Sequence, residues 1–359
     1  FALIRNFRRH AFVLLYLFGA SPAVCGSFVA GRPHELLPMP GANGTLHMPH
    51  GTSLRMGRLG YQSEAQASLN VSCNSLESYA NSLHDALTRP YPAYEAVGVR
   101  NPGGEYNQLA TTLLQIENEF YGLIRPKRVI FPGERPLHAL RERGVEYIEV
   151  RCMDLDPFEP VGINTQTMRV LDVFLLHCLL ADSPPDTPAE VAALGRNQHR
   201  VAARGREPGL LLEQGEHTVT LADWARELLV ECVPIAEALD AAQGGGEANA
   251  AALAAVRALV DQPGQLPSAR VLETMRSHYG GSYVQFTRVQ SAATRQKLLA
   301  LPWTDAQAQR YAAMAAASVA EQQRIEAADT MPFEQYRLAY LSPERLQPRR
   351  GAQLASTPA

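Results

Sequence analysis

The chain has 359 residues, of which 46% are hydrophobic and 19% charged, so it can bury one large core or two ordinary ones and is not intrinsically disordered. Its formal net charge of −3 lacks the basic excess that is typical of proteins binding nucleic acid broadly. Five cysteines without CxxC spacing match neither a disulfide framework nor a zinc site, which favours a reducing compartment such as the cytoplasm.

The first segment is basic from Arg5 to His10 and apolar from Ala11 to Ala20, a pattern that imitates a secretory signal peptide. The apolar run is too short to span a bilayer, and the arginines alternate with phenylalanines as in an amphipathic helix. We therefore expect a helix with one buried face over residues 1–18, internal to a longer protein.

The rest of the first half combines a loop, a helix and two strand-like segments. Residues 31–51 form a stretch rich in Pro, Gly and His that predicts a loop, and residues 76–87 have helical periodicity. Two segments, Thr111–Tyr121 and Val145–Asp154, alternate apolar and polar residues as strands do.

From Thr165 onward the pattern is helical, with apolar or Ala-rich helices expected over 170–181, 221–242, 248–260 and 306–328. We expect a sheet-bearing part with the functional motifs over 1–164, a helical part packed on it over 165–341, and a loose tail over 342–359. The predicted fold class is α+β.

The segment Val145–Asp154 has the clearest functional pattern. Alternation places its apolar side chains on one face and Tyr147, Glu149 and Arg151 on the other. A carboxylate and a guanidinium two residues apart suit a site that holds a metal with Glu149 and a phosphate or carboxylate with Arg151. The spacing alone is equally compatible with a surface ion pair between Glu149 and Arg151, which would contribute about 0–1 kcal/mol to stability.

The segment Thr111–Tyr121 places Gln115, Glu117 and Glu119 on one strand face. Such an acidic stripe can bind Mg²⁺, although most acidic stripes are simply solvated. The basic stretch Arg125-Pro126-Lys127-Arg128 follows, and it suits either phosphate contact or a solvated loop. Acidic and basic groups this close together favour a site for a nucleotide with Mg²⁺.

A glycine-punctuated turn places Arg55 shortly before Tyr61, and both side chains could recognise the carboxylate of an amino acid. A single loop arginine is more often solvated. The sequence contains no GxxxxGK[ST] phosphate loop and no GxGxxG, HExxH or GxSxG motif, which removes several common enzyme classes.

In their order along the chain, these segments resemble the proteobacterial-type glutamate–cysteine ligase family. The matching segments are Tyr16–Ala23, Thr52–Arg55, Leu59–Tyr61, Leu114–Glu119, Tyr121, Ile124–Arg128, Gly144–Arg151, Glu326–Thr330 and Pro332–Phe333. They extend over nearly the whole chain, as far as about Tyr336. The resemblance also favours an internal helix over a signal peptide at the start of the chain.

The resemblance implies ATP-dependent joining of the γ-carboxylate of L-glutamate to the amine of L-cysteine, the first step of glutathione synthesis. The reaction would pass through γ-glutamyl phosphate, with ATP and Mg²⁺ as cofactors. Glutamate, cysteine and ATP would be the partners, with neither nucleic acid nor membrane involved. The implied fold is similar to that of glutamine synthetase, with an antiparallel sheet forming a funnel packed with many helices.

Matching motifs also imply roles for single residues. Arg151 resembles the clamp on the transferring phosphoryl group, and Glu149 resembles a Mg²⁺ ligand. Arg55 resembles a contact to glutamate, whereas Tyr61 and Tyr121 resemble the hydroxyls that receive the cysteine carboxylate. The weaker candidates, all on the nucleotide and metal side, are Gln115, Glu117 and Lys127.

Members of this family begin well before Phe1, and that earlier part supplies metal-binding carboxylates and further strands of the funnel. We therefore expect an N-terminally truncated ligase that is inactive and poorly folded as an isolated fragment. Two alternatives stay open. One is a related carboxylate–amine ligase acting on another amine, and the other is a non-catalytic relative, which the intact motifs disfavour.

Overall fold

The computed structural model describes residues 1–63, 65–66 and 69–348. The helices are α1 (Ala2–Phe18), α2 (Leu76–Thr88), α3 (Pro92–Val97), α4 (Pro136–Arg143), α5 (Thr165–Leu180), α6 (Pro188–Arg204), α7 (Leu221–Glu231), α8 (Val233–Ala242), α9 (Ala248–Val260), α10 (Pro267–Tyr279), α11 (Tyr283–Leu299), α12 (Asp305–Ala328) and α13 (Phe333–Leu341). The strands are β1 (Ala23–Cys25), β2 (Leu37–Pro38), β3 (Thr45–His47), β4 (Ile124–Lys127), β5 (Tyr147–Val150), β6 (Leu211–Gln214) and β7 (His217–Thr220).

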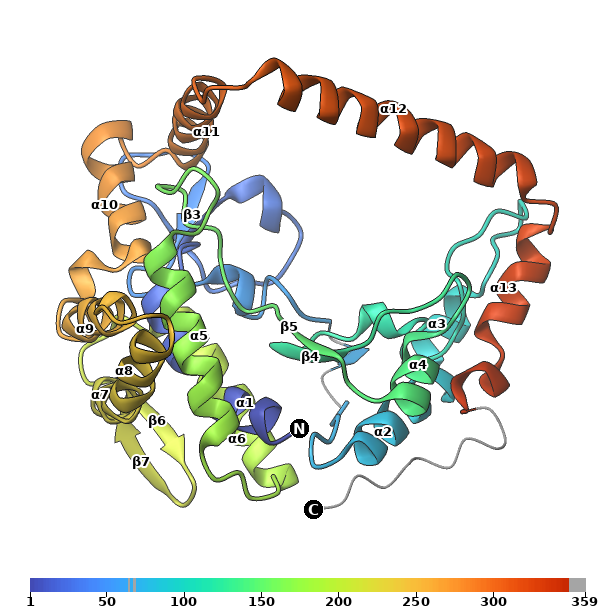
Figure 1. Cartoon of the computed structure of the whole chain (residues 1–359), viewed down its shortest axis with the longest axis horizontal. Helices are drawn as coiled ribbons and strands as arrows, with labels where there is room; N and C mark the ends of the chain where they lie inside the picture. The colour runs from blue at the N-terminus through green and yellow to red at the C-terminus, as the bar shows by residue number, and fades with distance from the viewer. Residues whose placement is uncertain (64, 67–68, 349–359) are drawn as a thin grey trace.

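In the described residues the strands form three small antiparallel sheets, in the orders β1-β3-β2, β4-β5 and β6-β7. Helices predominate, and the predicted α+β class is confirmed. Figure 1 shows β4 and β5 between the helical bundle around α1 and a second group formed by α2, α3 and α4. No helix of the described part is both long and apolar enough to cross a bilayer.

Helix α1 confirms the helix expected over residues 1–18 and lies in the main core, but residues 11–17 are all buried, so its second half is enclosed on every side and not on one face alone. Phe7 and Leu14 are at most 2% exposed, and the helix contacts α5, α6 and β4. Each large apolar side chain buried in this way contributes about 1.5–3 kcal/mol. Arg5 is also buried, and the carbonyl oxygens of Cys73 and Ser183 accept its guanidinium hydrogens at 3.1 and 2.7 Å.

The helices of the second half confirm most of the predicted ranges. Helix α9 begins and ends where predicted, α5 extends the range 170–181 towards its N-terminus, and α12 begins one residue before the range 306–328. The single helix expected over 221–242 is instead two helices, α7 and α8. The break occurs at Cys232 because Pro234 fits the first turn of a helix but not its interior.

The stretch 31–51, expected to be a loop, contributes β2 and β3 to the sheet with β1. His47 in β3 is buried, and its Nδ1 lies 3.1 Å from the carbonyl oxygen of Leu37. This strand pairing is too short to produce a clear alternation in the sequence.

Helix α12 crosses from α11 to α13 along one side of the molecule (Figure 1). None of its residues is buried, so it acts as a bridge about 36 Å long between the parts at its ends. The tail after α13 was expected to be loose, but its first part forms the 3-10 helix η6 (Pro343–Leu346). This helix is packed against the protein, because Leu346 is 1% exposed and η6 contacts α2 and α4. Residues 349–359 of that tail lie outside the described residues.

Candidate functional site

The strand predicted over Val145–Asp154 is confirmed in part as the shorter β5, which pairs antiparallel with β4, and Arg151 follows directly after it. Glu149 is opposite Arg125, and Tyr147 is opposite Lys127. Opposed residues of such a pair project to the same side of the sheet, so these four side chains share one face. The apolar residues of β5 pack against the main core instead. We call the side that carries Arg125, Lys127, Glu149 and Arg151 the charged face.

Glu149 lies between two cations on the charged face. Its Oε2 is 3.5 Å from Nζ of Lys127 and 3.2 Å from Nη1 of Arg151. Burial works against ionisation of the carboxyl group, but the charges of Lys127 and Arg151 outweigh it and lower the pKa of Glu149 below its ordinary value. Glu149 is therefore a carboxylate at neutral pH, as a metal ligand must be.

Arg55 belongs to the short 3-10 helix η2 (Leu54–Met56), which the side chain of Ser53 caps. The Arg55 guanidinium donates to the carbonyl oxygens of Arg151 at 2.7 Å and of Met153 at 3.2 Å, just beyond β5. These two contacts bind the Arg55 turn to the end of the charged face, although the two segments are far apart in the sequence.

Tyr61 lies where these side chains meet. The guanidinium carbons of Arg55 and Arg151 are 5.3 and 5.0 Å from its ring centroid, within the range of cation–π attraction. The ring of Tyr121 packs edge-on against it, with 4.6 Å between the centroids. Nη2 of Arg125 donates to Oη of Tyr61 at 3.2 Å. The structure thus brings together residues from motifs that are separate in the sequence.

Arg125 belongs to this site, although its sequence context predicted only a basic stretch. It lies in a strand and is 5% exposed. The order Ile124, Arg125, Pro126, Lys127 alternates apolar and basic residues, which is the signal that predicts a strand with both cations on one face. Arg128 turns away from the charged face and donates to the carbonyl oxygen of Arg143 at 2.9 Å.

The predicted strand over 111–121 is wrong. This segment is an irregular loop that includes the 3-10 helix η4 (Glu117–Glu119). Oε1 of Gln115 accepts the backbone N–H groups of Leu109 at 2.6 Å and of Ala110 at 3.2 Å. Gln115 and Glu119 therefore bind the loop's own backbone, and the polar residues of this segment do not form an acidic stripe on a strand.

Glu117 points into the protein and is 7% exposed. Its carboxylate accepts the Nε–H of Arg135 at 3.0 and 3.2 Å, the Nη2–H of Arg135 at 2.8 Å, and the N–H of Leu137 at 3.2 Å. Both oxygens are engaged, so Glu117 is half of a buried ion pair, a placement that disfavours the expected role as a metal ligand. Its partner lies 18 residues away and belongs to no local pattern.

Metal-binding capacity on the charged face rests on Glu149. Across the part of the chain that the structure describes, no three His, Cys, Asp or Glu side chains are arranged as a metal site. One carboxylate is nonetheless enough for Mg²⁺ when substrate phosphates and water supply the other oxygen ligands. Glu149 therefore fits Mg²⁺ as one ligand among several.

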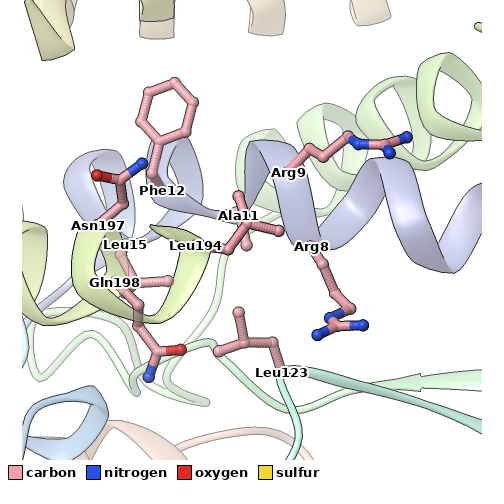
Figure 2. Close-up of a pocket in the computed structure, with 9 residues that line it drawn as sticks. All are labelled: Arg8, Arg9, Ala11, Phe12, Leu15, Leu123, Leu194, Asn197 and Gln198. Carbon is pink, nitrogen blue, oxygen red and sulfur yellow. The ribbon is translucent and has the colours of Figure 1, made fainter. Parts of the chain in front are cut away.

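A small cavity lies behind β4, between α1 and α6 (Figure 2). Figure 2 shows Leu123, the residue before β4, pointing towards Ala11 of α1 and Leu194 of α6. The cavity has a volume of about 10 Å³, which suffices for one water molecule at most. It is therefore a packing void and not a binding site.

Comparisons with known proteins identify the family of the chain. The model of the Glutamate-cysteine ligase family matches residues 1–201. The chain is 47% identical over 344 residues to the glutamate–cysteine ligase of Alcanivorax borkumensis and 47% identical over 339 residues to that of Pseudomonas putida. These matches cover 95% and 94% of this chain but only 65% and 64% of the two relatives.

Solved structures give the same result. A crystal structure of glutamate–cysteine ligase from Francisella tularensis in complex with AMP is similar with a TM-score of 0.85 and 32% identity, covering 95% of this chain and 66% of that one. A bifunctional glutathione synthetase from Pasteurella multocida is similar in fold alone, with a TM-score of 0.56 and 22% identity over 82% of this chain and 32% of that one. The chain belongs to the glutamate–cysteine ligase family.

Proposed function

We propose that the protein joins the γ-carboxylate of L-glutamate to the amine of L-cysteine at the expense of ATP, the first step of glutathione synthesis. The observation that carries this proposal is the meeting of Arg55, Tyr61, Tyr121, Glu149 and Arg151 at one end of the charged face. Family membership supports it, and so does the similar Francisella tularensis ligase, whose crystal structure is a complex with AMP.

The charged face suits phosphorylation of a carboxylate followed by displacement of phosphate. Arg151 would hold the transferring phosphoryl group through its guanidinium, which compensates the charge that spreads over the phosphoryl oxygens. ATP phosphorylates the glutamate γ-carboxylate to γ-glutamyl phosphate, and the cysteine amine attacks its carbonyl carbon as phosphate leaves. The amine must lose a proton in this second step.

Two further groups belong to the phosphate side of the site. Mg²⁺, when bound, would be held by Glu149 together with phosphate oxygens and would neutralise the polyphosphate. Lys127 projects from the same face and would contact a phosphate as a point charge. Gln115 stays a weaker candidate for the nucleotide, because its side-chain oxygen is already used within its own loop.

The substrate amino acids would bind on the tyrosine side. Arg55 would contact glutamate with the part of its guanidinium that faces away from β5. Tyr61 and Tyr121 would donate their hydroxyl hydrogens to the cysteine carboxylate, and Tyr121 is 41% exposed and accessible for this role. The β4–β5 pair would then be part of the glutamine-synthetase-like sheet funnel.

A reducing compartment, the cytoplasm, is the proposed location. All five cysteines are free thiols. Burial raises the pKa of the Cys152 thiol, next to the site, to about 12, so this group stays protonated and unreactive while cysteine is handled as a substrate.

The test is ATP-dependent turnover by the full-length protein, followed as ADP release with glutamate and a series of amines. Cysteine should be the preferred amine, whereas a different preferred amine would indicate a related ligase. Arg151→Ala should lower kcat by about 10²–10³-fold while folding is kept. Arg257→Ala, which removes an exposed arginine of α9, is the matched control and should leave turnover unchanged. A loss below about tenfold for Arg151→Ala would remove the proposed role.

A further inference from the structure

Arg125 is the most deeply buried cation of the charged face. It is 5% exposed, whereas the side chains of Lys127 and Arg151 are each 28% exposed. Its Nη2 donates to Tyr61 Oη and to the carbonyl oxygen of Asn118, each at 3.2 Å. Its Nε–H has no hydrogen-bond partner among the described residues. A buried donor without a partner destabilises the folded state, so the hydrogen bonds of Arg125 do not fully compensate its burial.

Tyr61 is the side chain to which Arg125 donates a hydrogen bond among the described residues. Burial lowers the pKa of Arg125 and the neighbouring Arg151 lowers it further, whereas Tyr61, Tyr79 and Glu149 raise it. The guanidinium also lies 5.9 Å from the ring centroid of Phe120, near the limit of cation–π attraction. The hydrogen bond to the phenol oxygen of Tyr61 is thus the contact that connects the buried Arg125 to the site.

The contact fixes the direction in which the Tyr61 hydroxyl can donate. A guanidinium has five N–H donors and no acceptor, so Arg125 can only occupy a lone pair of the phenol oxygen. The hydroxyl hydrogen must therefore point away from Arg125. No acceptor for it occurs among the residues that the structure describes. Arg55, Arg151 and Tyr121 pack against the ring itself, and the hydroxyl hydrogen is the donor that Tyr61 can offer to a ligand.

We propose that Arg125 is a positioning residue that makes Tyr61 a fixed hydrogen-bond donor to the carboxylate of the amine substrate. This inference rests on the proposed ligase function. Arg125 does not touch the substrate, but it prevents the Tyr61 hydroxyl from turning inward. A site with a fixed, partly desolvated donor discriminates strongly against an analogue that lacks the acceptor. Arg125 would thereby set the preference for amines that carry a carboxylate.

The experiment compares L-cysteine with cysteamine, which has the same thiol and amine but no carboxylate. ADP release by the full-length protein gives kcat/KM for each amine with glutamate and ATP saturating. Arg125→Met should lower kcat/KM for cysteine about ten- to a hundredfold, mainly through KM, and should leave cysteamine almost unchanged. Arg125→Lys keeps a cationic donor and should restore most of the preference, which also guards against a poorly folded methionine variant.

Two comparisons separate positioning from general damage. Tyr61→Phe should lose the same preference, and the Arg125→Met/Tyr61→Phe double variant should be no worse than Tyr61→Phe alone, because both changes remove one interaction. Arg5→Met is the matched control, since it removes another buried arginine that lies outside the site, and it should lower stability without changing the preference.

Each outcome decides the question. The positioning role would be overturned if Arg125→Met and Arg125→Lys each lowered kcat/KM equally for cysteine and cysteamine. It would also be overturned if the effects of Arg125→Met and Tyr61→Phe on kcat/KM were additive. A wild-type protein that releases no ADP with glutamate and cysteine would instead overturn the proposed function, and with it the inference.

Discussion

Replacing Glu117 by Gln tests the buried ion pair with Arg135. Glutamine keeps the shape of the side chain but removes the charge that compensates the guanidinium. The two side chains are 6% and 1% exposed, so water cannot take over this compensation. Removing one partner of a buried pair costs about 3–5 kcal/mol. We expect the free energy of unfolding to fall by this amount, a large part of the roughly 5–15 kcal/mol that stabilises a typical protein.

A double-mutant cycle assigns the loss to the pair. Arg135→Met removes the cation and keeps much of its volume, although it also loses the hydrogen bond to the carbonyl oxygen of Tyr340. In the Glu117→Gln/Arg135→Met variant no buried charge lacks a partner, so the two losses should fall short of additivity by at least about 1 kcal/mol. Glu213→Gln is the matched control, because its partners Arg196 and Arg200 are 54% and 38% exposed and exposed pairs contribute about 0–1 kcal/mol.

The assay is urea unfolding at neutral pH, followed by circular dichroism and tryptophan fluorescence. A Mg²⁺ titration of ATP-dependent turnover is added at a temperature where every variant is folded. A structural pair predicts a large loss of stability with an unchanged Mg²⁺ requirement. A stability change below about 1 kcal/mol, together with a raised Mg²⁺ requirement, would refute this reasoning and restore Glu117 as a metal ligand.

Three further predictions concern other parts of the molecule. Burial, with the charges of His177 and Arg9, lowers the pKa of His10 to about 4. The unfolded chain takes up this proton near pH 6.5, so up to about 3 kcal/mol of stability is lost as the pH falls from about 6.5 to about 4. The urea midpoint of His10→Gln should fall less steeply with decreasing pH than that of the wild type. If the two midpoints fell in parallel, the lowered pKa of His10 would not be the cause of the loss. A Cβ at Gly60 would clash with the carbonyl oxygen of Arg55, so Gly60→Ala should displace Tyr61 and lower kcat/KM at least about tenfold. Gly195→Ala, where a Cβ meets nothing, is its control, and equal activity of the two variants would count against the placement of Tyr61. Glu149→Gln should raise the Mg²⁺ concentration needed for turnover, whereas an unchanged titration would exclude metal binding by this residue.

The sequence predicted those parts of the site whose pattern is local. The two faces of β5 follow from the alternation of apolar and polar residues with a period of two. Strands β4 and β5 pair with Arg125 opposite Glu149. The loop around Gln115 shows the same period for a different reason, since its amide and carboxylate groups bind neighbouring backbone N–H groups. Alternation alone does not distinguish these two causes.

Contacts between distant segments could not be predicted in this way. The burial of Glu117 depends on Arg135, and the role of Arg125 depends on Tyr61, which lies 64 residues earlier. The roles given to Arg55, Tyr61 and Tyr121 came from the family resemblance, because a single arginine or tyrosine in a loop has no pattern of its own. Packing of η6 was missed because one buried leucine among polar residues gives no periodicity.

The contacts of the C-terminal segment determine the order in which the protein can be completed on the ribosome. Arg135 donates to the carbonyl oxygen of Tyr340, and Arg337 donates to that of Leu109, in each case across more than 200 residues of sequence. The group formed by α2, α3 and α4 is synthesised early, yet it cannot finish packing until α13 and η6 have emerged. The packing of this group therefore stays incomplete while the helical half is synthesised, because contacts over such long sequence separations form only after both segments have been made.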